Sequence, residues 1–306
     1  MKIKTCGSLI VAAATTAFFT LPASAQITGS LGTTSVSYGS ALSVQTINTA
    51  FGASTGAANS DNDDYNGSEL DAAYGVVSGG NLYLFLSGDI QGAYSNNGNS
   101  QNSIQVFIGG GGSTVGQTTL STSVSPLSTM NGTTFASGMN ATLGLTFNDY
   151  QGTVYADVAN LQGGGGGYLG SDSLTGGIGS STETGSGYSI GVALNNTLVS
   201  TMGTGGTALS GASSGANTTT GLELAIPLAD LGTISGNIDV VADINNGNLN
   251  YLSNQTLPGQ AVGTGNLGGS TLSNANYFVV AVPEPSTWSI MAASGLGGLF
   301  MFRRRK

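Results

Sequence analysis

The side chains of this sequence best suited to chemistry are carboxylates, and they are most concentrated in residues 60–71, SDNDDYNGSELD. Calcium takes about six to eight such hard oxygen ligands from flexible loops. Read from Asn62, the segment has the form Asn-x-Asp-x-Asn-Gly, with Gly67 at the sharp-turn position of an EF-hand loop. The match is partial, because the twelfth position holds Ala73 instead of glutamate. The candidate calcium ligands are Asp61, Asp63, Asp64, Asn66, Glu69 and Asp71.

A solvated acidic loop is the simpler interpretation of this segment. We expect no other cofactor. The chain has 15 acidic residues, and removing Glu284 leaves 14 between residues 26 and 282, where there is no Lys, Arg or His. A surface of that sign repels phosphate backbones, so a nucleic-acid partner is excluded.

The missing residue types exclude most catalytic chemistry. All basic residues lie at the two ends of the chain, as Lys2, Lys4, Arg303, Arg304, Arg305 and Lys306. The interior therefore holds no Ser-His-Asp or Cys-His arrangement, no His or Cys zinc site, no Schiff-base lysine and no arginine for phosphate. A carboxylate pair of the kind that glycosidases use remains, but no spacing selects one. We therefore expect a protein that is not an enzyme.

The N-terminus has the three parts of a secretory signal peptide. A basic MKIK precedes an apolar stretch, residues 7–20, and Ala23-Ser24-Ala25 forms a small-x-small cleavage site before Gln26. We expect residues 1–25 to be removed, with cleavage between Ala25 and Gln26. Because Cys6 lies in the removed part, the mature protein would have no cysteine.

The C-terminus also has three parts, in residues 283–306. Pro283, Glu284 and Pro285 form a stiff break that ends any strand ladder. Residues 286–302 are apolar and uncharged, and they predict a transmembrane helix of about 25 Å, slightly shorter than a hydrocarbon core of about 30 Å. The basic cluster 303–306 should remain cytoplasmic and leave the preceding chain outside the inner membrane.

This arrangement resembles the PEP-CTERM sorting signal of Gram-negative bacteria, with Pro-Glu-Pro, hydrophobic helix and basic end in the same order. The resemblance implies a transient partner, the membrane-embedded transpeptidase or protease exosortase, acting near Pro-Glu-Pro. It also implies transient anchoring in the inner membrane, then a cell-surface or extracellular location linked to exopolysaccharide and biofilm. It implies a destination and no activity.

Hydrophobic periodicity predicts strands throughout residues 26–282. The expected strands are residues 82–88, 103–109, 141–147, 152–158, 187–194, 221–227, 237–244 and 276–282. Turn signals flank several of them, at Gly79-Gly80, at residues 149–152 and at Asn246-Gly247. One helical turn is expected, at residues 227–232. We predict an all-β fold with one β-sandwich domain, residues 26–282.

Two stretches, residues 68–90 and 221–232, resemble the β-sandwich of DOMON domains and family 9 carbohydrate-binding modules. The resemblance implies a jelly-roll or DOMON-like sandwich. It does not extend to ligand residues, because those binding modules grip sugars with tryptophans and the single Trp288 lies in the membrane segment. Haem-binding DOMON domains use histidine, which is absent.

Tyrosines could replace tryptophan as sugar-stacking residues, since they combine an apolar face with a polar tip. Most tyrosines in a fold of this kind finish the core or its rim. Three hypotheses therefore remain open. We favour a non-catalytic exported surface or matrix protein, with a glycan such as extracellular polysaccharide as a candidate ligand that the sequence does not identify. The alternatives are a glycoside-active enzyme using a carboxylate pair and a calcium-stabilised adhesive module.

Overall fold

The computed structural model describes residues 25–47, 49, 68–90, 102–110, 115–197, 218–232, 234, 236–260 and 265–283. Most of the expected signal peptide, the acidic residues 61–66 and the C-terminal segment 284–306 lie outside these ranges. Within the described ranges no helix is long and apolar enough to cross a membrane. The transmembrane helix expected at 286–302 lies outside the described residues.

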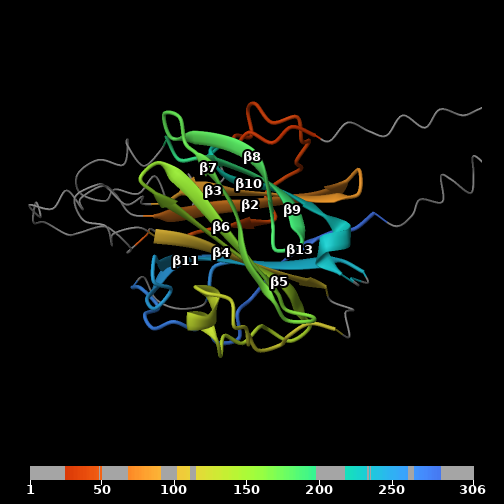
Figure 1. Ribbon diagram of the computed structural model, residues 1–306, viewed down its shortest axis with the longest axis vertical. Helices are drawn as coiled ribbons and strands as arrows, with labels where there is room; N and C mark the ends of the chain where they lie inside the picture. Colours follow the sequence, from red (N-terminus) through yellow and green to blue (C-terminus); the bar gives the residue numbers. More distant parts are fainter. Residues whose placement is uncertain are drawn as a thin grey trace, which may run out of the picture.

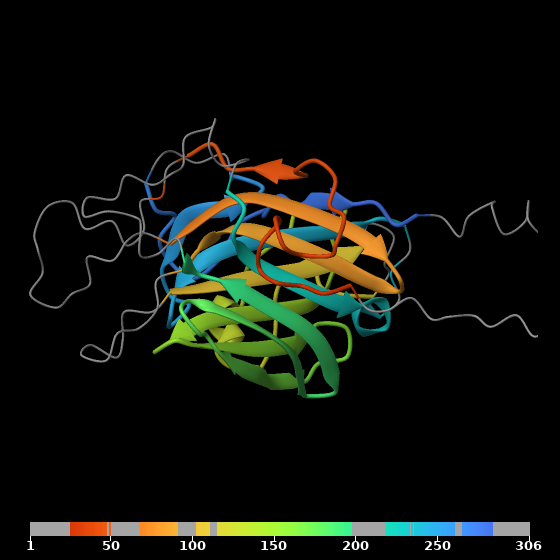
Figure 2. The same ribbon diagram turned by 90° about the horizontal axis from the view of Figure 1, so that it is seen from above.

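Two antiparallel sheets form the body of the protein (Figures 1 and 2). The first runs in the order β1 (Ser43–Val44), β2 (Glu69–Ser78), β3 (Asn81–Asp89), β10 (Gly221–Pro227), β9 (Tyr188–Asn195) and β8 (Ile178–Gly185). The second runs in the order β12 (Leu252–Leu257), β11 (Ile238–Asn246), β4 (Asn102–Gly110), β5 (Ala141–Tyr150), β6 (Thr153–Asn160) and β7 (Gly166–Ser173). A short strand, β13 (Phe278–Val280), also pairs with β11. The prediction of an all-β fold is confirmed.

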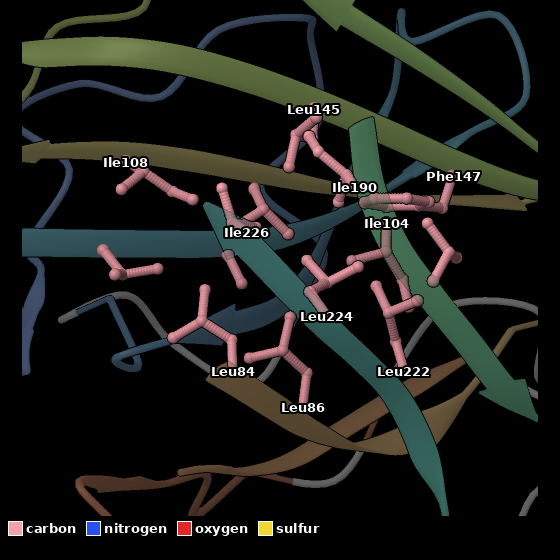
Figure 3. Packing of buried hydrophobic residues seen from close by; sticks show 14 of the residues in the cluster. Leu84, Leu86, Ile104, Ile108, Leu145, Phe147, Ile190, Leu222, Leu224 and Ile226 are labelled. Atoms are coloured by element: carbon pink, nitrogen blue, oxygen red, sulfur yellow. The ribbon is translucent and has the colours of Figure 1, made fainter. Parts of the chain in front are cut away.

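The main core lies between the two sheets and comes from the period-2 alternation of their strands. Leu84 and Leu86 of β3 and Leu224 of β10 point from the first sheet towards Ile104 of β4 and Leu145 of β5 in the second (Figure 3). The intervening residues of each strand point outwards. This alternation explains why apolar and polar positions that are adjacent in sequence have opposite environments.

Each outer face is partly covered by loops. Residues 25–47 cross the first sheet, where Ile27 and Val36 pack with Tyr83 and Ala193. The second sheet is covered by residues 115–139, which include the 3-10 helix η1 (Leu127–Met130), and by residues 265–277. These segments bury the outward-pointing Phe107 of β4 and Val241 of β11.

One side of the sandwich is closed by side chains that connect the sheets. The Gln45 Nε2 donates a hydrogen bond to the carbonyl of Thr256 at 2.8 Å. The Gln255 Oε1 accepts one from the Leu70 N–H at 3.3 Å, and its Nε2 donates to the carbonyl of Ile47 at 3.2 Å. On the other side, β7 of one sheet leads directly into β8 of the other. Both sheets are therefore linked at both sides.

The eight expected strands are present, with ends shifted by a few residues. The expected Gly79-Gly80 turn joins β2 to β3, and both glycines have positive φ, 57° and 84°. The helical turn is the 3-10 helix η4 (Leu228–Leu231). Strands β1, β2, β7, β8 and β12 are missing from the predicted set. Strands β7 and β8 are rich in Gly, Ser and Thr and have no hydrophobic alternation that would reveal them.

Candidate functional site

Carboxylates gather at one end of the sandwich, which we call the acidic end and define by Glu69, Asp71, Asp89 and Asp149. There β2 begins with Glu69, β3 ends with Asp89, and β5 ends next to Asp149. Residues 61–66 immediately precede β2, so the acidic segment of the sequence leads into this end. The structure thus places Glu69 and Asp71, the two candidate calcium ligands that it describes, beside Asp89 of the adjacent strand, and it places Asp149 of the second sheet at the same end.

Glu69 and Asp89 are direct partners across β2 and β3, and their side chains are 0% and 1% exposed. A β-bulge between Leu70 and Ala72 leaves Asp71 without a partner in the ladder. Its carboxyl group hydrogen-bonds the side chains of Glu69 and Thr218. The bulge therefore brings a third carboxyl group next to Glu69 and Asp89.

Burial raises the pKa of both Asp71 and Asp89. Loss of solvation raises the pKa of Asp71, against the smaller lowering effect of its hydrogen bonds to Glu69 and Thr218. The pKa of Asp89 lies well above its usual range, because of burial first and the charge of Asp71 second. Residues 26–282 contain no Lys, Arg or His to compensate these charges.

Asn196 joins the two sheets at the acidic end. Its Oδ1 accepts a hydrogen bond from the Ile90 N–H at 2.9 Å, and its Nδ2 donates to the carbonyl of Ile90 at 2.8 Å. The same Nδ2 donates to Asp149 Oδ2 at 3.2 Å, and the Gly152 N–H donates to Asp149 Oδ1 at 3.0 Å. Burial still raises the pKa of Asp149, and these two hydrogen bonds oppose the rise.

The buried carboxylates of the acidic end require neutralisation, which either protons or a bound cation can supply. No group of three or more His, Cys, Asp or Glu among the described residues is arranged to hold a metal ion. Asp61, Asp63, Asp64 and Asn66 lie outside the described residues, so the calcium site stays a prediction. The C-terminal part of the segment does not match an EF-hand loop, because residues 69–78 form a strand and Ala73, at the twelfth loop position, lies in the main core.

Glu223 is a buried carboxylate whose role the sequence did not suggest. It lies on the outer face of β10, and four donors from the N-terminal segment surround it. Its Oε2 accepts from the N–H groups of Thr28 at 2.8 Å and Gly29 at 3.0 Å. Its Oε1 accepts from Thr34 Oγ1 at 2.7 Å and Tyr38 Oη at 3.1 Å. The sequence signal that could have identified this buried carboxylate is a single acid within the apolar run GLELAIP.

Asp243 and Asp239 point outwards from β11. Asp243 is fully buried opposite Gln105 of β4, and burial raises its pKa well above the usual range. Among the described residues, neither of its carboxyl oxygens has a hydrogen-bond partner. The Gln105 Nε2 donates to Thr146 Oγ1 at 3.1 Å. Burial raises the pKa of Asp239 to about 6.

The tyrosines divide into covered and open positions. Tyr83 lies on the outer face of β3, between the inward-pointing Leu82 and Leu84, but residues 25–47 cover it and it is 2% exposed. Tyr155, Tyr168 and Tyr251 are exposed, at 37%, 54% and 47%. Tyr155 and Tyr168 lie on neighbouring strands β6 and β7. Tyr65 and Tyr94 lie outside the described residues.

The fold and this site define an all-β protein of two packed sheets whose acids are buried without basic partners. Residues 281–306 match the family model of the PEP-CTERM protein-sorting motif. The chain therefore carries this motif, which begins at Ala281, directly after β13. Neither the curated proteins nor the solved structures gave a match, so the DOMON-like resemblance is not confirmed.

The sorting motif indicates how the protein is exported. A protein that carries it is exported, anchored transiently in the membrane and recognised by exosortase, and it reaches the cell surface or the extracellular space. Of the predicted motif residues, Pro283 is described and exposed. Glu284, Pro285 and the basic cluster Arg303, Arg304, Arg305 and Lys306 lie outside the described residues. Ala25 and Gln26, the expected signal cleavage site, are the first described residues.

Proposed function

We propose that this exported protein binds neutral polysaccharide outside the cell and does not cleave it. The observation that carries the proposal is the pair of exposed tyrosines on the second sheet, Tyr155 on β6 and Tyr168 on β7. We call the surface formed by Tyr155, Asp157 and Tyr168 the tyrosine strip.

The strip is built by strand alternation. Val154 and Ala156 point into the main core, so Tyr155 and Asp157 point outwards from β6. Leu169 also points inwards, so Tyr168 points outwards from β7. Asp157 and Tyr168 are direct partners across the two strands. Two aromatic rings therefore share one sheet face with a half-buried carboxylate, an arrangement that suits a sugar ring and its hydroxyl groups.

The charges favour a neutral polymer. Sugar hydroxyls donate hydrogen bonds to a carboxylate such as Asp157, whereas a uronate or phosphate group would be repelled. Residues 26–282 offer no Lys, Arg or His to hold an anionic group. The strip therefore supports binding to neutral chains over acidic ones.

The positions of the carboxylates support a role without hydrolysis. A glycosidase needs two carboxyl groups that flank the bond to be cleaved. Glu69, Asp71 and Asp89 are almost fully buried and cannot contact a polysaccharide. Asp157 and Asp172 are half-buried, but Asp157 points outwards from β6 while Asp172 lies against Gly179 of β8. These two acids do not face a common substrate.

Affinity electrophoresis of the processed protein through gels containing neutral or acidic polysaccharide tests this function. If a sugar covers about 50 Å² of each ring, the loss of one ring costs about 1.3 kcal/mol, or about tenfold in affinity. Tyr155→Ala and Tyr168→Ala should each weaken retardation in neutral gels by that amount. Tyr251→Ala removes an equally exposed ring elsewhere and should have no effect. Retardation that survives loss of both strip tyrosines would refute the site, and release of sugar would refute the non-catalytic role.

A further inference from the structure

The C-terminus leaves the sandwich at the end opposite the acidic end. Strand β13 pairs antiparallel with the beginning of β11, with Val280 opposite Ile238. The other end of β11, Asn246, pairs with the first residue of β4, Asn102, at the acidic end. The side chain of Asn102 donates a hydrogen bond to Ser68 Oγ at 2.8 Å, next to Glu69.

The N-terminus leaves at the same end as the C-terminus. The Ala25 N–H donates a hydrogen bond to Tyr83 Oη at 3.2 Å. Tyr83 is near the start of β3, whereas Asp89 at the other end of β3 belongs to the acidic end. The red and blue ends of the coloured chain accordingly lie together on the right of Figure 2. We call this the terminal end and define it by Ala25, the turn 79–80 and Val282.

The connection between the terminal end and the sorting motif is very short. Val280 is 1% exposed in the main core, and Val282 packs against that core. A Cβ built on Gly75 of β2 would lie 2.5 Å from Val280 Cγ2, so β13 sits closely against the first sheet. Three residue-to-residue steps, at about 3.3 Å each, lead from Val280 to Pro283, or about 10 Å in all. So short a connection does not let the sandwich turn over.

The two ends differ in their acidic residues as well. The exposed turns 78–80, between β2 and β3, and 186–187, between β8 and β9, consist of small neutral residues, and this end also holds Asp230 in η4 and the buried Asp239 near the start of β11. Glu69, Asp71, Asp89 and Asp149 lie at the other end, about 30 Å away along nine-residue strands. Repulsion between acids and an anionic lipid surface decays within about 8 Å at physiological ionic strength.

We infer that the membrane-anchored precursor stands upright on the lipid surface, with its terminal end against the headgroups and its acidic end facing away. The short connection sets this orientation, and the neutral turns of the terminal end allow close approach. The acidic end lies several screening lengths from the lipid. It is thus presented to the exterior before exosortase releases the protein.

Site-specific fluorescence quenching tests the orientation. The precursor left after signal-peptide cleavage, residues 26–306, has no cysteine, so Ser78→Cys labels the terminal end and Thr175→Cys labels the turn between β7 and β8 at the acidic end. Both positions are exposed. Each labelled protein is reconstituted into phosphatidylethanolamine–phosphatidylglycerol vesicles that carry a headgroup nitroxide quencher.

The label at position 78 should be quenched at least about twofold more than the label at position 175. Equal quenching, or stronger quenching at 175, would overturn the orientation. A matched protein with 20 Gly and Ser residues inserted between Val282 and Pro283 should lose the difference. A difference that persists with the inserted linker would show that the short connection does not set the orientation. Neither outcome depends on polysaccharide binding.

Discussion

Glu69 and Asp89 occupy directly opposite positions on β2 and β3, and both carboxyl groups are buried. Like charges placed opposite each other on a sheet destabilise it. The pair is therefore compatible with the folded state only when a proton or a cation neutralises it. Because residues 26–282 have no basic side chain, the solvent must supply that neutralisation.

Stability should be greatest in mild acid and should fall as the pH rises through about 6. Burial raises the pKa of Asp239 to about 6, and it raises the pKa of Asp89 and Asp243 well above the usual range. The folded state then holds protons that the unfolded state has already released above about pH 4, so raising the pH favours unfolding. Urea unfolding of the processed protein at pH 4, 6 and 8 measures the trend.

Asp243→Asn provides the control for that trend. The amide has the shape of the protonated acid and does not titrate, so the variant should lose less stability between pH 4 and pH 8, by about 1.4 kcal/mol for each unit of pKa shift removed. A parent protein whose stability rises over this range would contradict the prediction.

Calcium should stabilise the protein at neutral pH if the acidic segment binds it. A ligand at a hundredfold excess over its dissociation constant adds about 2.7 kcal/mol to the free energy of unfolding. The melting temperature should rise with millimolar calcium, fall with chelator, and respond less to magnesium, which demands a stricter octahedral geometry. Asp63→Ala with Asp64→Ala should abolish the response.

Protons compete with calcium for the same carboxylates, so the calcium response should shrink at pH 4. If the melting temperature at pH 7.5 does not change with calcium, residues 60–71 form a solvated loop that binds no calcium. Protons alone would then neutralise the buried carboxylates.

Glu223→Gln should loosen the N-terminal segment. An amide places an N–H₂ group where one oxygen now accepts hydrogen bonds from Thr28 and Gly29 or from Thr34 and Tyr38. Because hydrogen bonds to a charged group contribute about 1.5–3 kcal/mol each, we expect a loss of about 2–4 kcal/mol. Limited proteolysis should cut within residues 25–47. Thr33→Ala, which removes an exposed hydroxyl beside Thr28, should leave the segment protected.

Gly75→Ala should displace β13. The new methyl group would lie 2.5 Å from Val280 Cγ2, and overpacking of this kind costs about 1–3 kcal/mol. Val280→Ala in the same chain removes the clashing methyl, so the double variant should be less destabilised than the sum of the two single variants. Additive losses in thermal unfolding would show that the two residues are not coupled.

Replacement of Pro283, Glu284 and Pro285 by alanine should leave the protein in the inner membrane of an exosortase-bearing host. Mass spectrometry of the secreted parent protein should show a chain that has lost residues 303–306. Secreted protein that retains Arg303 to Lys306 would rule out C-terminal processing.

Much of this architecture could be read from local patterns. Alternating runs such as residues 82–88 identify strands because side chains alternate between the faces of a sheet, whatever partner the strand finds. Pro283, the apolar stretch and the basic end identify the sorting motif because all its parts are contiguous. The lack of Lys, Arg and His between residues 26 and 282 excludes whole classes of chemistry without any structure.

The contacts between the acidic residues, which composition and residue spacing could not predict, depend on how the strands pair in the tertiary structure. Asp89 meets Glu69 through the register of β2 and β3, and the bulge at Asp71 turns a third acid towards them. Glu223 receives its hydrogen bonds from residues almost 200 positions away, as the 195-residue separation from Thr28 shows. Burial depends on which strands become neighbours, and that choice minimises the free energy of the whole chain, so no local pattern encodes it.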